Sequence, residues 1–158
     1  MSALVLIFGL LALSGLLAYV SVAIVGGEQI AVLERRWLGA SMPDGRVVAL
    51  PHEVGVQARI LGPGLHFLVP FLYRVRKTSM IAIAENEVGL VESIDGEPVA
   101  PGRIFARVVT GHNLFQDGEA FLSNRGEKGP QLQMLPPGLY RVNPYLFTIV
   151  KVKAAYIP

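Results

Sequence analysis

Three histidines and two acidic turns are the residues in this sequence with the most versatile chemistry. His52, His66 and His112 lie 14 and 46 residues apart, and no other His or carboxylate stands at the spacing of a zinc site. The acidic turns Asp95–Glu97 and Asp117–Glu119 supply too few oxygen ligands for an EF-hand calcium loop. These patterns predict histidines that serve packing or the surface, and they predict no metal and no cofactor.

Motifs for covalent or phosphoryl chemistry are absent from the sequence. There is no G-x-S-x-G nucleophile elbow, no Walker-type phosphate loop and no G-x-G-x-x-G dinucleotide fingerprint. The loop Gly126–Gly129 lacks the Ser or Thr and the preceding strand that a phosphate loop needs. The sequence therefore favours a protein that is not an enzyme.

Charge and cysteine content exclude two further classes. The chain of 158 residues has 14 Lys and Arg against 12 Asp and Glu, and the net charge of +2 is too small to indicate nucleic-acid binding. There is no cysteine, which excludes disulfides and thiolate metal sites. All of the charged side chains follow Gly27.

The uncharged segment Ala3–Val25 is the part of the sequence that indicates where in a cell the protein lies. As a helix of 23 residues it would be about 35 Å long, which is enough to cross a hydrocarbon core of about 30 Å. A cleaved signal peptide is the alternative, although no Lys or Arg precedes the run and Val20–Ala23 is a weak cleavage site. We interpret residues 1–27 as a transmembrane anchor.

The basic residues that flank this anchor predict its orientation. No Lys or Arg precedes the anchor, whereas Arg35, Arg36 and Arg46 follow it closely. The positive-inside rule then predicts a single-pass protein of the cell membrane, with a short N-terminus outside and the remaining chain on the cytoplasmic side.

Beyond residue 27 the sequence has the pattern of β structure. Short runs rich in Val and Ile, such as Ile30–Leu33, Gly55–Leu61 and Met80–Ala84, are bounded by Gly, Pro or Asp. Pro-Gly pairs suit tight type II turns between antiparallel strands. The expected fold class is a mainly β protein with minor α content (α+β), behind an N-terminal transmembrane helix.

Two phrases of the sequence each occur twice, in the same order. The phrase LPPGLYRVNPYLF at 135–147 repeats LGPGLHFLVPFLY at 61–73, and NEVGLVE at 86–92 repeats EQIAVLE at 28–34. Duplication of one β-rich unit explains this shared order better than chance among 17 Gly and 11 Pro.

The repeats divide the chain into an anchor and two tandem, antiparallel β-rich units. The predicted bounds are 1–27 for the anchor, 28–84 for a membrane-proximal first unit and 85–158 for a second unit. The second unit is longer because of an insertion at about 107–131, which we expect to form a short helix and a Gly-rich loop. The insertion is a candidate partner-contact loop, with the residues Phe115, Asp117, Phe121, Arg125 and Lys128.

The uncharged stretch Ile60–Tyr73 is a candidate for a second membrane contact. It is too short to span a bilayer, and two buried strands around a Pro-Gly turn are its simplest interpretation. The alternative is a hairpin whose apolar tip enters the bilayer while the basic residues after it bind anionic head groups. The candidate membrane-contact residues are Leu65, Phe67, Phe71, Tyr73, Arg74, Arg76 and Lys77.

The order of these features resembles the stomatin/prohibitin/flotillin (SPFH, or band 7) superfamily. The resemblance rests on an anchor, then Gly-Glu-Gln-Ile at 27–30, then GPGLHF at 62–67 running into Pro70-Phe71. In the second unit FQDGEAFL, KGPQ and LPPGLYRVNPYLF resemble a flotillin-like bacterial branch, so the resemblance covers essentially all of the chain.

This resemblance implies a non-catalytic scaffold. Members of the superfamily form large homo-oligomeric rings or cages that enclose a patch of bilayer, organise membrane microdomains and regulate membrane proteins or proteases. They continue into a long coiled-coil helix that drives assembly, and Ala155–Pro158 resembles the lead-in to another β unit. These residues are then either a fragment of a longer protein or a short form that lacks the assembly element. We favour the fragment and expect homo-oligomers to form through the longer parent protein.

Two other functions remain open at this point. The chain is alternatively an adaptor that binds a client, such as a membrane protein or protease, through the inserted loop. The second alternative is a secreted β-protein whose apolar head is removed as a signal peptide.

Overall fold

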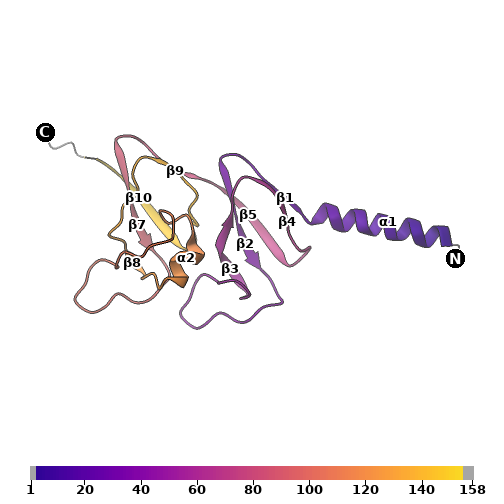
Figure 1. The fold of residues 1–158 in the computed structure, drawn as a ribbon, viewed down its shortest axis with the longest axis horizontal. Coiled ribbons are helices and arrows are strands. Elements are labelled where there is room, and N and C mark those ends of the chain that lie inside the picture. Colours follow the sequence, from indigo (N-terminus) through magenta and orange to yellow (C-terminus); the bar gives the residue numbers. More distant parts are fainter. Residues whose placement is uncertain (1–2, 155–158) are drawn as a thin grey trace.

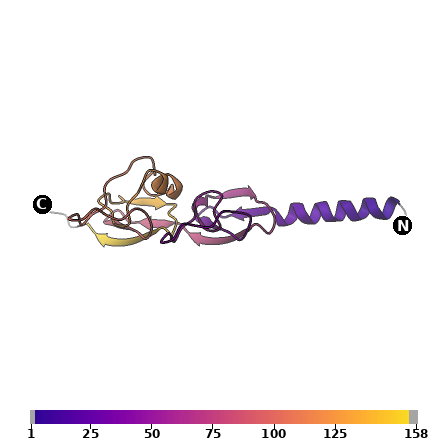
Figure 2. The ribbon, with the colours of Figure 1, turned by 90° about the horizontal axis from the view of Figure 1, so that it is seen from below.

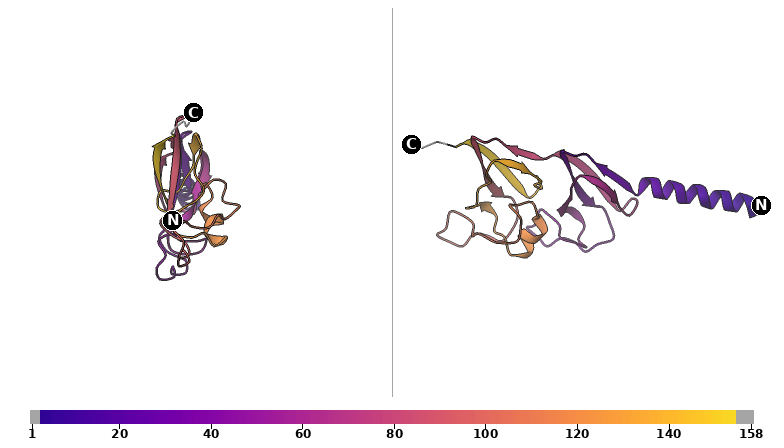
Figure 3. Two further views of the ribbon diagram at one scale, coloured as in Figure 1. Left: turned by 90° about the vertical axis from the view of Figure 1, so that its left-hand side faces the viewer. Right: turned by 45° about the horizontal axis from the view of Figure 1, so that its top comes forward.

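The computed structural model describes residues 3–154 and shows a mainly β protein behind an apolar helix (Figure 1). The helix and two β-rich parts lie in a row, so the molecule is long and narrow (Figures 2 and 3). We call residues 22–79 the first β part and residues 81–153 the second β part. The predicted fold class is confirmed to this extent: mainly β structure follows a helix that could span a membrane.

Helix α1 (Ala3–Val20) is apolar on all sides, with a mean hydropathy of 2.5, and none of its residues is buried. Its length and composition could serve a membrane anchor or a signal sequence. The expected helical segment extended to Val25, but Val22–Val25 form strand β1 instead. Three of these four residues are β-branched, and they gain a partner strand by leaving the helix.

The first β part contains two small antiparallel sheets. Strand β2 (Gln29–Arg35) lies between β3 (Gly55–Leu61) and β5 (Tyr73–Ser79), and β1 pairs with β4 (Gly64–Phe67). Their inner faces enclose a small core, formed by Val25, Ala31, Leu33 and Leu61.

The second β part has the same pairing. Strand β7 (Glu87–Ser93) lies between β8 (Gly129–Pro130) and β10 (Phe147–Lys153), and β6 (Ile81–Ile83) pairs with β9 (Gly138–Tyr140). In both parts, therefore, the second strand is central and the first strand pairs with the fourth. The repeated phrases of the sequence lie on these equivalent strands. The domain bounds at 84 and 85 stay a prediction.

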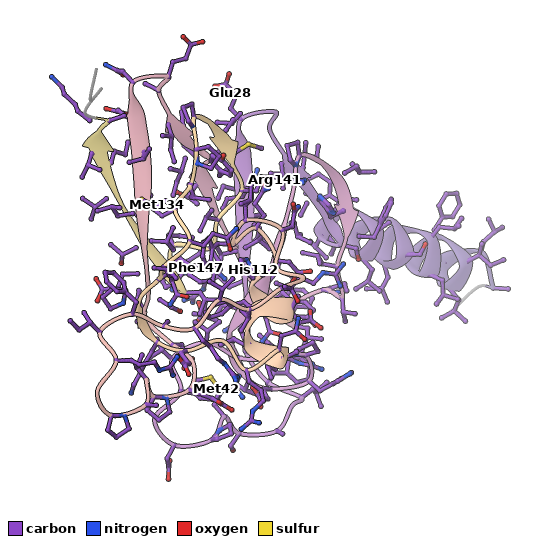
Figure 4. The ribbon with its side chains drawn as sticks, turned by 60° about the vertical axis from the view of Figure 1, so that its left-hand side comes forward. Glu28, Met42, His112, Met134, Arg141 and Phe147 are labelled. Carbon is purple, nitrogen blue, oxygen red and sulfur yellow. The ribbon has the colours of Figure 1, made fainter. Side chains whose placement is uncertain are left out.

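Helix α2 (Gly118–Ser123) belongs to the insertion and covers a larger core. The rings of Phe115, Phe121 and Phe147 lie 4.9–6.1 Å apart, mostly tilted or edge-to-face. Figure 4 shows Phe147 and His112 in this interior, and the His112 ring lies 4.4 Å from that of Phe115. The second β part is therefore built around an aromatic cluster that its insertion supplies in part.

A clasp of Arg, Glu and Gln closes the long loop of the first β part. Arg46 donates to the carboxylate of Glu53 at 3.1 Å, and Gln57 Nε2 donates to the carbonyls of Glu53 and Gly55 at 2.9 and 3.1 Å. The N–H of Leu50, three residues before Glu53, donates to the same carboxylate at 2.7 Å.

The same clasp recurs in the second β part. Arg103 donates to Glu127 at 2.6 Å, and Gln131 Nε2 donates to the carbonyls of Glu127 and Gly129 at 2.8 and 2.9 Å. The N–H of Arg107 has the place that the N–H of Leu50 has in the first β part. Arg107 lies twenty residues before Glu127, and its N–H donates to the carboxylate of Glu127 at 2.9 Å. The extra chain of the second β part therefore lies between Arg107 and Glu127.

Buried polar contacts hold the two β parts together. The side chain of Asp95 accepts hydrogen bonds from the N–H groups of Val47 and Val48, both at 2.8 Å. Asn143 Nδ2 donates to the carbonyls of Gln57 and Ala58 at 2.9 and 3.1 Å. Each buried group left without a partner would destabilise the fold by about 1–3 kcal/mol, so these contacts fix how the parts sit on one another.

The clasp predicts a pH dependence of stability. The N–H of Arg107 and the guanidinium of Arg103 lower the pKa of Glu127 below its ordinary value. A lowered folded-state pKa stabilises the fold above the unfolded pKa of about 4.3, and this contribution disappears as the pH falls through the folded pKa. We expect the free energy of unfolding to fall between about pH 5 and pH 3, and to fall less steeply in Glu127→Gln.

Urea unfolding of the detergent-solubilised protein, followed by circular dichroism at several pH values, measures this effect. Glu85→Gln is the matched control, because Glu85 is exposed, and its slope should equal that of the unmodified protein. A slope for Glu127→Gln as steep as that of the unmodified protein would contradict the prediction.

Candidate membrane interface

Strands β1 and β4 form a two-stranded ribbon whose outer face is apolar; we call it the membrane-proximal ribbon. Val22 pairs with Phe67 and Ile24 pairs with Leu65, and all four side chains alternate onto the same face. These four residues are 37–75% exposed, whereas Val25 on the opposite face is buried against the first core. An apolar outer face of this kind is unusual for a surface in water and marks a contact site.

The membrane-proximal ribbon is fixed to the end of α1. Only Ser21 separates the helix from β1, its carbonyl accepts the N–H of Leu68 at 2.8 Å, and its hydroxyl donates to the Leu17 carbonyl at 2.6 Å. The ribbon is the part of the β structure next to α1 (Figure 1; Figure 3, right). Its apolar face therefore continues the apolar surface of the helix.

The turn after β4 and the start of the long loop enlarge this surface. Val69, Phe71, Trp37 and Leu38 are exposed, and Trp37 Nε1 donates to the carbonyl of Phe71 at 3.1 Å. Phe71 has a positive φ of 60°, a conformation that is strained for a bulky side chain. Tryptophan is enriched at membrane–water boundaries because its ring is apolar and its N–H is polar.

Sequence reasoning identified Leu65, Phe67 and Phe71 as membrane-contact residues, and the structure brings them together on this surface. It missed a further set, because a strand shows which of its faces is covered only once its partners are known. The added residues are Val22, Ile24, Trp37, Leu38 and Val69. The single Trp of the chain was the available signal.

Tyr73 does not belong to the exposed surface. It is half-buried against the first core, and the guanidinium carbon of Arg35 lies 5.9 Å from its ring centroid. Alternation along β5 turns Tyr73 and Val75 inward, and the expectation that Tyr73 contacts lipid stays a prediction.

Arg74 and Arg76 form ion pairs within the protein. Both pair with the carboxylate of Glu34, at 3.7 and 3.0 Å, and Arg76 also donates to the hydroxyl of Tyr145 in the second β part at 3.3 Å. They occupy the face of β5 opposite to Tyr73, so they face the second β part. Lys77 is the third basic residue that was expected to bind head groups. By alternation along β5 it lies on the same face of the strand as Tyr73.

The residues of the expected partner-contact loop differ in exposure. Phe115 and Phe121 are buried in the aromatic core, where they hold the insertion in place. Phe121 lies on α2, whereas Phe115 precedes the helix and has a positive φ of 62°. Asp117 caps α2 by accepting the N–H of Ala120 at 2.9 Å.

Arg125 and Lys128 are exposed on the loop after α2. Arg125 donates to Glu97 at 2.7 Å, and this hydrogen bond raises the pKa of its guanidinium. A partner that binds here would meet an ion pair and one exposed lysine.

Two of the histidines make contacts within the fold, and His52 is exposed. His66 lies 2.8 Å from the carbonyl of Gly62, and burial lowers the pKa of His112, whose Nδ1 accepts the N–H of Phe115 at 2.9 Å. Within residues 3–154 no group of three or more His, Asp or Glu side chains could hold a metal ion.

Trp37 provides a direct test of the interface. In vesicles whose acyl chains carry bromine, we expect quenching of Trp37 fluorescence, because an apolar surface that lies against lipid would bring Trp37 close to the bromine atoms. Phe67→Asp should reduce this quenching by roughly half or more, since a carboxylate in the outer face disfavours lipid contact. Leu139→Asp, on an exposed apolar residue of the second β part, is the matched control and should leave quenching unchanged. Emission of the unmodified protein that is insensitive to bromine would contradict the prediction.

Comparisons of the chain with protein-family models, with curated proteins and with solved structures found no match.

Proposed function

We propose that this chain is a non-catalytic membrane scaffold of the SPFH type. In this proposal α1 spans the cell membrane and the two tandem β-rich units extend from it on the cytoplasmic side. Copies assemble into homo-oligomeric rings or cages that organise membrane microdomains. The observation that carries the proposal is the apolar outer face of the membrane-proximal ribbon, which lies next to the end of α1 (Figure 1).

Two joined lipid contacts would orient the β structure. A fully buried Leu, Val or Phe side chain contributes about 1.5–3 kcal/mol, so the four outer residues of the ribbon would add several kcal/mol to the anchoring by α1. Contact at both α1 and the ribbon restricts the tilt of the β structure, whereas a helix alone would leave it free to swing. An upright row of units is a suitable building block for a wall around a patch of bilayer.

The contacts within the insertion of the second β part support a structural role. The insertion packs around an aromatic cluster, Glu127 belongs to the clasp and Asp117 caps α2. The inference that copies form homo-oligomers rests on the resemblance to SPFH proteins.

The experiment is performed on the full-length product of the gene in its native membrane. We expect it to resist extraction by alkaline carbonate, because a transmembrane helix is not released by loss of charge contacts. After mild detergent extraction, negative-stain images should show rings or cages far larger than a single chain.

A variant that lacks residues 3–20 is the control, and it should be released by carbonate. Release of the unmodified protein, or a mature N-terminus that begins near Gly26, would eliminate the anchor. Images with monomers alone would eliminate the scaffold and leave the anchor intact.

A further inference from the structure

The contact between the two β parts uses a defined surface of the first part. The N–H groups of Val47 and Val48 donate to Asp95 of the second part, and Val48 belongs to the core of the second part, where it is 0% exposed. The carbonyl of Ala58, which is 1% exposed, accepts from Asn143. The first part therefore offers two backbone donors, two small or branched apolar side chains and a backbone acceptor.

The repeated clasp shows where the same surface lies on the second β part. Val47 and Val48 directly follow Arg46, and the matching residues after Arg103 are Ile104 and Phe105. Ala58 directly follows Gln57, and the residue after Gln131 is Leu132. We call Ile104, Phe105 and Leu132 the distal surface.

The distal surface is apolar and uncovered. Phe105 is 49% exposed, whereas its counterpart Val48 is fully buried. Leu132 is 59% exposed, whereas its counterpart Ala58 is buried. Ile104 is 79% exposed. Within the described residues, the N–H groups of Ile104 and Phe105 donate no hydrogen bond to protein. The second β part thus carries the donors and a larger apolar area than the surface that the first part buries.

We propose that the distal surface binds a third β unit of the same architecture, joined in line to the second. A side-chain carboxylate of that unit accepts the N–H groups of Ile104 and Phe105, as Asp95 accepts those of Val47 and Val48. Apolar side chains of the third unit cover Phe105 and Leu132. The structure contains the template for this contact in its own interface.

The geometry of the existing link supports an in-line arrangement. The N–H of Met80 donates to the carbonyl of Glu28 at 2.9 Å, and β6 of the second part begins at the next residue. At the equivalent point the N–H of Ala154 donates to the carbonyl of Asn86 at 2.8 Å. The second β part starts directly after Met80, at a fixed point of the first β part. A unit joined after Ala154 would start at the matching point of the second β part.

A second copy of this chain fits the distal surface less well. Its Asp95 is 2% exposed and is already bonded within its own chain. In the second β part, Asp95 directly follows Ile94, whose N–H donates to the carbonyl of Leu146. The matching hydrogen bond of the first β part runs from the N–H of Arg36 to the carbonyl of Leu72. The residue that follows Arg36 is Trp37, which has no carboxylate.

The proposal is tested with a chain in which a copy of residues 81–154 is joined directly after Ala154. This copy supplies an unoccupied carboxylate, its own Asp95. The extended protein and the original chain are placed in lipid nanodiscs, and hydrogen exchange is measured by mass spectrometry on peptides that cover residues 103–106. We expect the amides of Ile104 and Phe105 to exchange at least about tenfold more slowly in the extended protein, because docking protects them.

Two variants separate docking from general stabilisation. Asp95→Ala in the added copy alone should restore fast exchange at Ile104 and Phe105. Phe105→Asp in the original second part should also abolish protection, whereas Leu139→Asp should not.

Unchanged exchange at Ile104 and Phe105 in the extended protein would overturn the proposal, whether or not the added copy folds. Protection that persists with Asp95→Ala in the copy would overturn the role of the carboxylate. The readout is independent of membrane anchoring and of ring formation, so its failure is distinguishable from failure of the proposed function.

Discussion

The carboxylate of Asp95 is the contact on which the in-line arrangement of the β structure depends. It accepts two consecutive backbone N–H groups of the first β part while it is almost fully buried. A carboxylate in that position is stable because hydrogen-bond donors replace the lost water. The apolar packing of Val48 into the second core then adds contact area, but it is the pair of hydrogen bonds that selects one orientation.

The two β parts have the same strand pairing and expose different chemistry. Phe67 lies on the outer face of the membrane-proximal ribbon, whereas the residue 74 positions later is Arg141. Arg141 lines a polar cleft of about 320 Å³ between the two parts, together with Arg59 and Asp117 (Figure 4 shows Arg141). Equivalent strands of the two β parts therefore carry different side chains. The first β part presents an apolar face next to α1, and the second presents a polar one at the cleft between the two parts.

The repeated phrases of the sequence predicted most of the fold because each carries its own turn chemistry. EQIAVLE and NEVGLVE lie on the central strands β2 and β7, and the Pro-Gly phrases precede the paired strands. Faces were harder to predict than elements. A short helix was expected in the insertion, but Phe115 lies before it and both Phe115 and Phe121 face the core. Alternation along β5 separates Tyr73 from Arg74 and Arg76. Neither pattern contains the partner that covers a face, because that partner is distant in sequence.

Hydrogen bonds at both ends of the first β part connect it to α1 on one side and to the second β part on the other. At one end Ser21 alone separates α1 from β1, and its carbonyl is bonded to Leu68. At the other end Asp95 and Asn143 hold the second β part through buried bonds that would have to break before the parts could swing. The direction of α1 is thereby linked to the direction of both β parts. If α1 spans a membrane and copies assemble as proposed, the tilt set by the membrane-proximal ribbon would determine the curvature of the wall.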